Sequence, residues 1–220
     1  MTSFYEKIME LPLFKGADFN LIHNFIEKTP LLFNRYADGD SIIYQDEACE
    51  GVTCLLDGII IIENRFGNDQ YILRRKLKHG IVLGAEFLFG LRTQYPYSVR
   101  AVGKCSTVTF SKSQYVMRLH DSNILMVNYL NYLSKRAQKG FNSFNRDGEC
   151  NEMWLLKNFI ELSTERHSYD IELICPKENS IFSNVSKNFI EQLKQMHFNR
   201  LVEIKSDNRL YIPDRSQFLA

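Results

Sequence analysis

The side chains of this 220-residue chain that most readily bind metals or take part in redox chemistry are its five cysteines and five histidines. The cysteines are Cys49, Cys54, Cys105, Cys150 and Cys175. No two of them form a C-x-x-C pair, and none has a histidine at the spacing of a zinc finger. The sequence therefore predicts reduced structural thiols, with neither a metal site nor a redox site.

The sequence shows no pattern of catalytic residues. No Ser/His/Asp set, carboxylate pair or phosphate-binding glycine loop stands at a spacing that would support an active site. We expect each histidine to lie at the surface or in a turn; they are His23, His79, His120, His167 and His197. The sequence therefore predicts a protein that is not an enzyme.

The composition is that of an ordinary soluble globular protein, with 45% hydrophobic and 24% charged residues. Its length suits one large domain or two small ones. No apolar run reaches the roughly 18 residues of a membrane span, and the acidic N-terminus does not resemble a signal peptide. We therefore expect a cytoplasmic protein without a membrane partner. The net charge of +1 neither supports nor excludes DNA binding.

Short segments rich in β-branched and aromatic residues fill the region from Phe33 to Phe110, separated by turn signals such as Asp57-Gly58. The expected strands are 41–44, 52–56, 59–62, 71–73, 97–102 and 106–110. Strands at this spacing predict an antiparallel sandwich or roll. Two short helices precede it, the second capped by Asp18, and a glycine-bounded stretch, Gly84 to Gly90, predicts a short helical insert.

A long helix is predicted over residues 121–144, with Asp121 or Ser122 as its N-cap. Its apolar residues alternate at spacings of four and three, as in a coiled-coil seam; they are Met126, Leu130, Leu133, Ala137, Gly140 and Phe144. Leu125, Tyr129 and Tyr132 form a second apolar edge. The helix is therefore either a core helix of a monomer or a helix that packs on its own domain and on a partner at once.

The C-terminal segment follows a hinge signal at Asn145–Gly148 and is compact. It predicts a helix over 152–162, a strand over 169–174, a short helix over 177–183, and a helix that Ser186 caps. A hairpin over 201–213 closes the segment. This order of helix, turn, helix and hairpin is that of a winged helix-turn-helix.

Several motifs in this order resemble the Crp/Fnr family of bacterial transcription regulators. They are Asp38-Gly39-Asp40, Leu55-Leu56-Asp57-Gly58, Leu83-Gly84, Ser98-Val99-Arg100-Ala101, Asn184-Val185-Ser186-Lys187 and Leu201-Val202. The resemblance implies an α+β protein with a cyclic-nucleotide-binding-like β-roll over 1–120 and a dimerisation helix over 121–146. It also implies a winged helix-turn-helix DNA-binding domain over 147–220. In the implied homodimer, the seam residues Met126, Leu130, Leu133, Ala137 and Phe144 lie at the interface.

The implied effector pocket departs from the family's nucleotide-binding pattern. Binding members begin the insert with Gly-Glu, whereas this chain has Gly84-Ala85 and places Glu86 one position later, which rotates a helical side chain by about 100°. The Arg-Ser pair that holds the phosphate is replaced by Tyr95-Pro96, shortly before Ser98. A buried phosphate would lack its strongest, bidentate contact. We therefore expect no cyclic AMP binding. We also expect no cofactor, no iron–sulfur cluster and no haem. The effector is unknown or absent.

The resemblance also places Lys187, Asn188 and Gln192 on the exposed face of a DNA-recognition helix. These residue types suit the task, because lysine donates to guanine, and asparagine or glutamine pairs with adenine. Ser186 would cap this helix and reach a phosphate, and Lys194 would contact the DNA backbone. The expected partners are therefore double-stranded DNA and a second copy of the chain, with RNA polymerase as a further candidate.

Two features of the C-terminal segment keep a second function open. Asn179 stands where the family has an apolar residue, and Pro176 crowds the start of the first helix of the motif. Acidic residues lie among the basic residues of this segment and reduce its positive charge; they are Glu191, Glu203 and Asp207. The alternative is a signalling or protein-interaction module with a degenerate DNA-binding domain.

Overall fold

The computed structural model describes residues 4–66, 71–78, 80–143, 169–174, 191, 194–195, 202–206 and 209–212. The chain divides into two compact units. The first comprises Met1–Ile60 and Lys78–Phe141, and the second comprises Ile61–Leu77 and Asn142–Ala220. The hairpin of strands β3 (Gly51–Phe66) and β4 (Tyr71–Lys78) thus contributes residues to both units.

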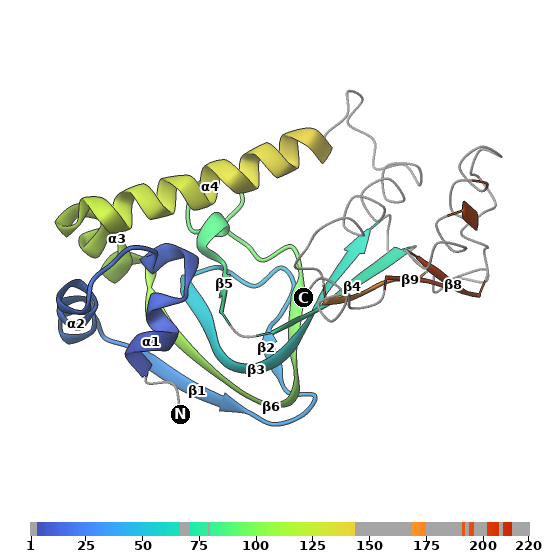
Figure 1. Ribbon diagram of the computed structural model, residues 1–220, viewed down its shortest axis with the longest axis horizontal. Helices are drawn as coiled ribbons and strands as arrows, with labels where there is room; N and C mark the ends of the chain where they lie inside the picture. The colour runs from blue at the N-terminus through green and yellow to red at the C-terminus, as the bar shows by residue number, and fades with distance from the viewer. Residues whose placement is uncertain are drawn as a thin grey trace. The chain divides into compact units, whose positions relative to one another are not determined.

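The two helices that the sequence predicts before the roll are both present. Helix α1 (Phe4–Met9) is followed by a 3-10 turn, η1 (Pro12–Phe14), and by α2 (Phe19–Lys28). The side chain of Asp18 caps α2 by accepting a hydrogen bond of 2.8 Å from the amide of Leu21. Together with α3 (Lys112–Asp121), these helices gather at one end of the roll (Figure 1).

The sheet of the first unit is built on β6 (Ser98–Ser111), the strand next to β3. Strands β1 (Leu32–Tyr36) and β2 (Ser41–Ile43) both pair with β6 in antiparallel fashion, and β5 (Ile81–Leu83) pairs with β3 in the same way. The core behind these strands contains mutually tilted rings; they are Phe14, Phe25, Phe110 and Tyr115. The predicted antiparallel roll is confirmed.

One predicted turn is wrong, because Asp57-Gly58 does not reverse the chain. Strand β3 runs without a break from Gly51 to Phe66, and Gly58 has a φ of +96° within it. A Cβ at Gly58 would lie 2.5 Å from the carbonyl oxygen of Lys104. The glycine therefore permits close approach of β6 at an irregular point of the strand. Likewise, the two strands expected over 97–102 and 106–110 are one strand, β6.

The insert and the long helix both form as predicted. The insert contains a 3-10 turn, η2 (Ala85–Phe87), and the long helix α4 spans Asn123–Ser143. The Ser122 side chain accepts a hydrogen bond of 3.4 Å from the amide of Leu125, so Ser122 caps α4. Leu125 and Tyr129 of the predicted second apolar edge are buried, whereas Phe144 lies outside the described residues.

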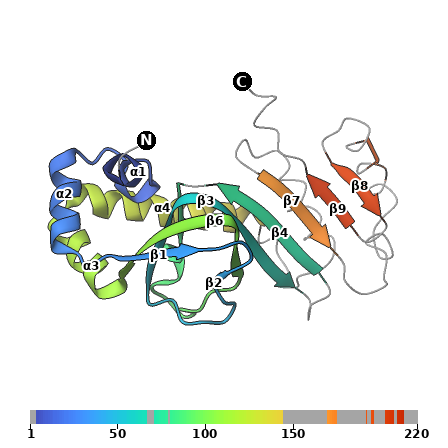
Figure 2. The same ribbon diagram turned by 90° about the horizontal axis from the view of Figure 1, so that it is seen from below.

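The second unit contains an antiparallel sheet in which β4, β7 (Tyr169–Ile174), β9 (Arg209–Ile212) and β8 (Glu203–Ser206) follow one another (Figure 2). The buried apolar side chains of this unit include Ile72, Ile171, Leu173, Val202 and Leu210. The predicted strand at 169–174 and the C-terminal hairpin are confirmed. The expected helices at 152–162 and 177–183 lie outside the described residues. Of the predicted recognition helix, only Glu191, Lys194 and Gln195 are described, and all three are helical.

Candidate functional site

The insert begins at Gly84, which has the left-handed conformation that glycine adopts readily (φ +86°). A Cβ at this position would lie 2.9 Å from the ring and the hydroxyl of Tyr95, and 3.0 Å from the thiol sulfur of Cys49. The next residue, Ala85, is fully buried. Backbone conformation and close packing therefore both require glycine at the first position of the insert.

Three aromatic rings pack on one another beside the insert. Tyr95 and Tyr97 are each only 6% exposed, and their ring centroids lie 5.9 Å apart. The ring of Phe87 lies 6.4 Å from that of Tyr95 and 5.8 Å from that of Tyr97. Rings at these separations are in direct contact. The segment expected to replace the phosphate-binding pair thus packs against the insert itself.

Glu86 points its carboxylate toward α4. Its Oε2 accepts a hydrogen bond of 3.0 Å from the hydroxyl of Tyr132, and its Oε1 lies 3.7 Å from Nη2 of Arg136. Arg136 also donates a hydrogen bond of 3.3 Å to the Tyr132 hydroxyl. The hydroxyl of Tyr129 donates to the carbonyl of Ala85 over 3.0 Å. The insert and α4 are therefore joined by a polar network from the chain's own side chains.

The tyrosines around Glu86 are held in their neutral, hydrogen-donating form. Burial, with the nearby Glu86 carboxylate as the next cause, raises the pKa of Tyr129 to about 12 and raises the pKa of Tyr132 further. The pKa of Tyr97 is raised by the same two causes. Burial lowers the pKa of Arg136, but Tyr132 and Glu86 outweigh this effect and raise it. The tyrosines of this network therefore keep their hydroxyl protons at neutral pH.

Cys49 supports the other side of the insert. Its thiol donates to the carbonyl of Gly84 over 3.2 Å, and burial raises its pKa. Burial also raises the pKa of Cys54. These two cysteines and Cys105 are free and buried, which agrees with the expected structural thiols, and Cys150 and Cys175 lie outside the described residues. The described residues contain no cluster of three or more metal-binding side chains.

The structure brings together four of the six predicted pocket residues, namely Gly84, Ala85, Glu86 and Tyr95. Pro96 is exposed, and the Ser98 hydroxyl accepts a hydrogen bond of 3.2 Å from the backbone amide of Gln45. The sequence reasoning missed further members of the site, which are Cys49, Phe87, Tyr97, Tyr129, Tyr132 and Arg136. The apolar edge of the long helix contained Tyr129 and Tyr132, but their hydroxyl partners are distant in sequence.

The predicted seam residues lie on a second face of α4. Met126 and Leu133 are partly exposed, Leu130 is 53% exposed, and Ala137 is exposed. Val127 is also 53% exposed. The described part of α4 therefore has one face buried on its own unit and an adjoining apolar face, the α4 stripe (Met126, Leu130, Leu133 and Ala137), that reaches solvent.

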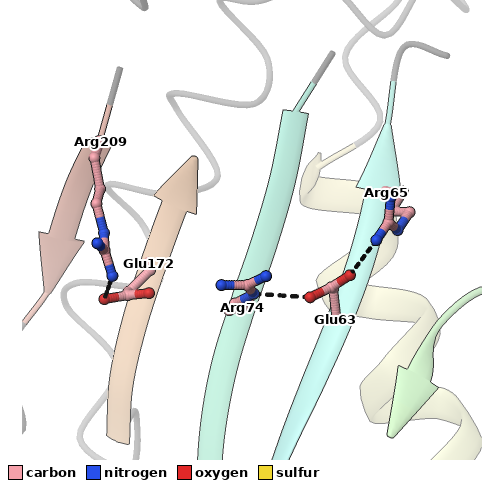
Figure 3. A network of polar contacts seen from close by, with 5 residues as sticks. All are labelled: Glu63, Arg65, Arg74, Glu172 and Arg209. Carbon is pink, nitrogen blue, oxygen red and sulfur yellow. Dashed lines mark hydrogen bonds and ion pairs between the residues drawn. The ribbon is translucent and has the colours of Figure 1, made fainter. Parts of the chain in front are cut away.

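The predicted DNA-contacting residues are only partly described. Lys194 is helical and exposed, while Ser186, Lys187, Asn188 and Gln192 lie outside the described residues. In the hairpin, Nη2 of Arg209 pairs with Glu172 on β7 over 2.6 Å (Figure 3). The Lys205 ammonium lies 3.8 Å from the centre of the Tyr211 ring. Both of these hairpin cations have partners within the chain.

A second ion-pair group lies on the hairpin that contributes to this unit. Glu63 on β3 accepts hydrogen bonds from Arg74 over 2.7 Å and from Arg65 over 2.8 Å (Figure 3). Burial alone would raise the pKa of Glu63, but the hydrogen bonds and charges of Arg74 and Arg65 lower it. Arg74 and Glu172 are opposite each other in the β4–β7 register. Charged residues of opposite sign therefore lie side by side on neighbouring strands here.

The first unit also contains a cavity of about 660 Å³ near the start of α3. It is lined by Ala48, Cys49, Glu50, Thr93, Ser111, Lys112, Ser113 and Val116. The Lys112 ammonium lies 4.5 Å from the centre of the Phe89 ring. No motif in the sequence predicted this cavity.

No helix among the described residues is both long and apolar enough to cross a membrane. No protein-family model matches the chain, and no curated protein sequence matches it. Solved structures do match. The roll, the insert and the long helix together define a protein with the fold of cyclic-nucleotide-binding domains, and the comparison of folds supports this assignment.

The catabolite activator protein of Thermus thermophilus is similar with a TM-score of 0.52 at 13% identity, over 94% of this chain and 96% of that chain. The sensor domain of the transcriptional regulator DNR from Pseudomonas aeruginosa has a TM-score of 0.48 at 19% identity, over 60% and 91% of the two chains. A transcriptional regulator from Thermotoga maritima has a TM-score of 0.48 at 18% identity, over 55% and 92%. At 13% identity, the similarity to the catabolite activator protein shows the fold alone.

Proposed function

We propose that this protein is a homodimeric, sequence-specific DNA-binding transcription regulator of the Crp/Fnr type, and not an enzyme. The fold, shared with a catabolite activator protein over most of both chains, supports the class. The observation that carries the proposal is the α4 stripe, because an exposed apolar seam at coiled-coil spacing is suited to pairing with a second copy of itself.

A charge placed in the α4 stripe tests the dimer. Leu130→Lys would bury an ammonium in the interface, whereas Asn131→Lys adds the same charge at the next, exposed position away from the stripe. Sedimentation equilibrium should show a dimer for the wild type and for Asn131→Lys, and a monomer for Leu130→Lys. Dimers of equal stability in all three proteins would refute this interface.

In the proposed dimer, two recognition helices face successive major grooves, one helical turn apart. Lys187, Asn188 and Gln192 read bases, while Ser186 and Lys194 contact phosphates. Binding selection on a random double-stranded DNA library should then recover a palindromic motif, and Gln192→Ala should relax it at one position per half-site. Recovery of no motif at low salt would contradict the DNA-binding function. RNA polymerase is the proposed further partner at such a site.

The hairpin supports a second candidate, a protein-interaction module whose DNA-binding domain is degenerate. Arg209 is paired with Glu172, and Lys205 lies over an aromatic ring, so both cations already interact with groups of the chain itself. Under this alternative, the library yields no motif at any salt concentration, while Leu130→Lys still produces a monomer. The library selection therefore separates the two functions, whereas the dimer experiment tests the interface that both share.

A further inference from the structure

The carboxylate of Glu86 is held in a largely buried position, with 16% of its side chain exposed. A charge in such a place is stable only when it is paired and hydrogen-bonded. The partners that the described residues give it, Tyr132 and Arg136, both belong to α4. Movement of α4 away from the insert would therefore cost this carboxylate both of these partners.

The contacts with the insert lie on one face of α4. Tyr129, Tyr132 and Arg136 follow at spacings of three and four residues, which places them on the same side of a helix. Tyr129 bonds to the backbone of Ala85, and the other two bond to the side chain of Glu86. Two successive residues of the insert, Ala85 and Glu86, thus bind α4.

The rings of Phe87, Tyr95 and Tyr97 pack on one another beside the insert. The contacts between insert and helix are made directly by the chain's own groups. We propose that Glu86, Tyr132 and Arg136 form a built-in latch that fixes α4 on the insert without any effector. Its consequence rests on the proposed function: in a dimeric regulator, a latched α4 makes DNA binding independent of a small molecule.

Hydrogen–deuterium exchange of the full chain, with no ligand added, tests the latch. The variants are Glu86→Gln, which removes the charge, and Tyr132→Phe, which removes the donor. The matched controls are Glu10→Gln and Tyr44→Phe, which make the same changes at exposed positions. Exchange in α4 between residues 129 and 138 should become about tenfold faster in both latch variants, the effect of one lost hydrogen bond to a charged group. The controls should match the wild type.

Two outcomes would overturn the latch. One is wild-type exchange in α4 for both latch variants. The other is an equal acceleration in β1 and α2, because this would mean a general loss of stability and not a release of α4. The DNA selection is a separate readout. Loosened α4 with no selected motif would refute the proposed function and leave the latch standing, whereas a selected motif with unchanged exchange would do the reverse.

Discussion

Replacing Gly84 by alanine should destabilise the first unit for two separable reasons. The residue has a φ of +86°, and an L side chain in the left-handed region costs about 1–2 kcal/mol. The new Cβ would also lie 2.9 Å from Tyr95 and 3.0 Å from the Cys49 sulfur, closer than carbon packs in folded proteins. Forcing an extra methyl group into a packed site costs about 1–3 kcal/mol. The total expected loss is about 2–5 kcal/mol.

Gly39→Ala is the matched control for the backbone contribution. Gly39 has nearly the same φ, +83°, but a Cβ there would meet no atom within 4 Å. Its expected cost is therefore about 1–2 kcal/mol alone. Urea unfolding followed by circular dichroism gives the free energy of unfolding and its denaturant slope for each variant. The difference between the two variants measures the close contact with Tyr95 and Cys49.

An equal loss in the two variants would refute the reasoning, because it would mean that the rings beside the insert yield to a methyl group at no cost. The packed aromatic cluster would then leave room near the insert. The same result would weaken the expectation that no small molecule enters this space.

Three further predictions follow from described contacts. Because Arg74 and Arg65 lower the pKa of Glu63, this carboxylate stabilises the fold above its unfolded-state pKa of about 4.3 and loses that effect as the pH falls through its lower native pKa. Glu63→Gln should therefore cost about 1 kcal/mol at pH 7 and flatten the acid limb of a plot of unfolding free energy against pH. Leu173→Ala, at a position 1% exposed, should cost about 2–5 kcal/mol in urea unfolding, whereas the exposed Glu203→Ala should change it by less than about 0.5 kcal/mol. Millimolar cyclic AMP should leave the melting temperature unchanged, and a concentration-dependent rise would contradict the expectation that cyclic AMP does not bind.

The spacing of apolar residues and the turn residues of the sequence predicted most of the described elements, but they could not assign a role to every glycine. Gly39 and Gly58 both follow an aspartate, and both have positive φ. The first lies at a reversal between β1 and β2, whereas the second lies within β3. A glycine that permits a turn and one that permits close approach of another strand carry the same local signal. The carbonyl of Lys104, which makes Gly58 necessary, belongs to a strand far along the chain.

The site was predicted where it depends on order in the sequence and missed where it depends on tertiary contact. The positions of Gly84, Ala85 and Glu86 follow from the motif that opens the insert. The partners of Glu86 do not, because Tyr132 and Arg136 acquire their roles only when α4 packs on the insert. The seam pattern assigned the adjoining face of the same helix to a partner chain. That assignment stays a prediction until the oligomeric state is measured.

The charges of the C-terminal hairpin determine how steeply DNA binding should depend on salt. To reach a phosphate, Arg209 must leave Glu172, whose side chain is 19% exposed and would then lack its partner. The interaction of Lys205 with an aromatic ring holds this second cation within the chain. Phosphate contacts from Lys194 alone neutralise two phosphates per dimer and give a slope of log affinity against log salt of about −2. Contacts from Arg209 and Lys205 as well would bring the total to six and steepen the slope to about −5. A slope near the steeper value, lost in Arg209→Gln, would show that the pair with Glu172 opens on DNA and would remove the main argument for the protein-interaction alternative.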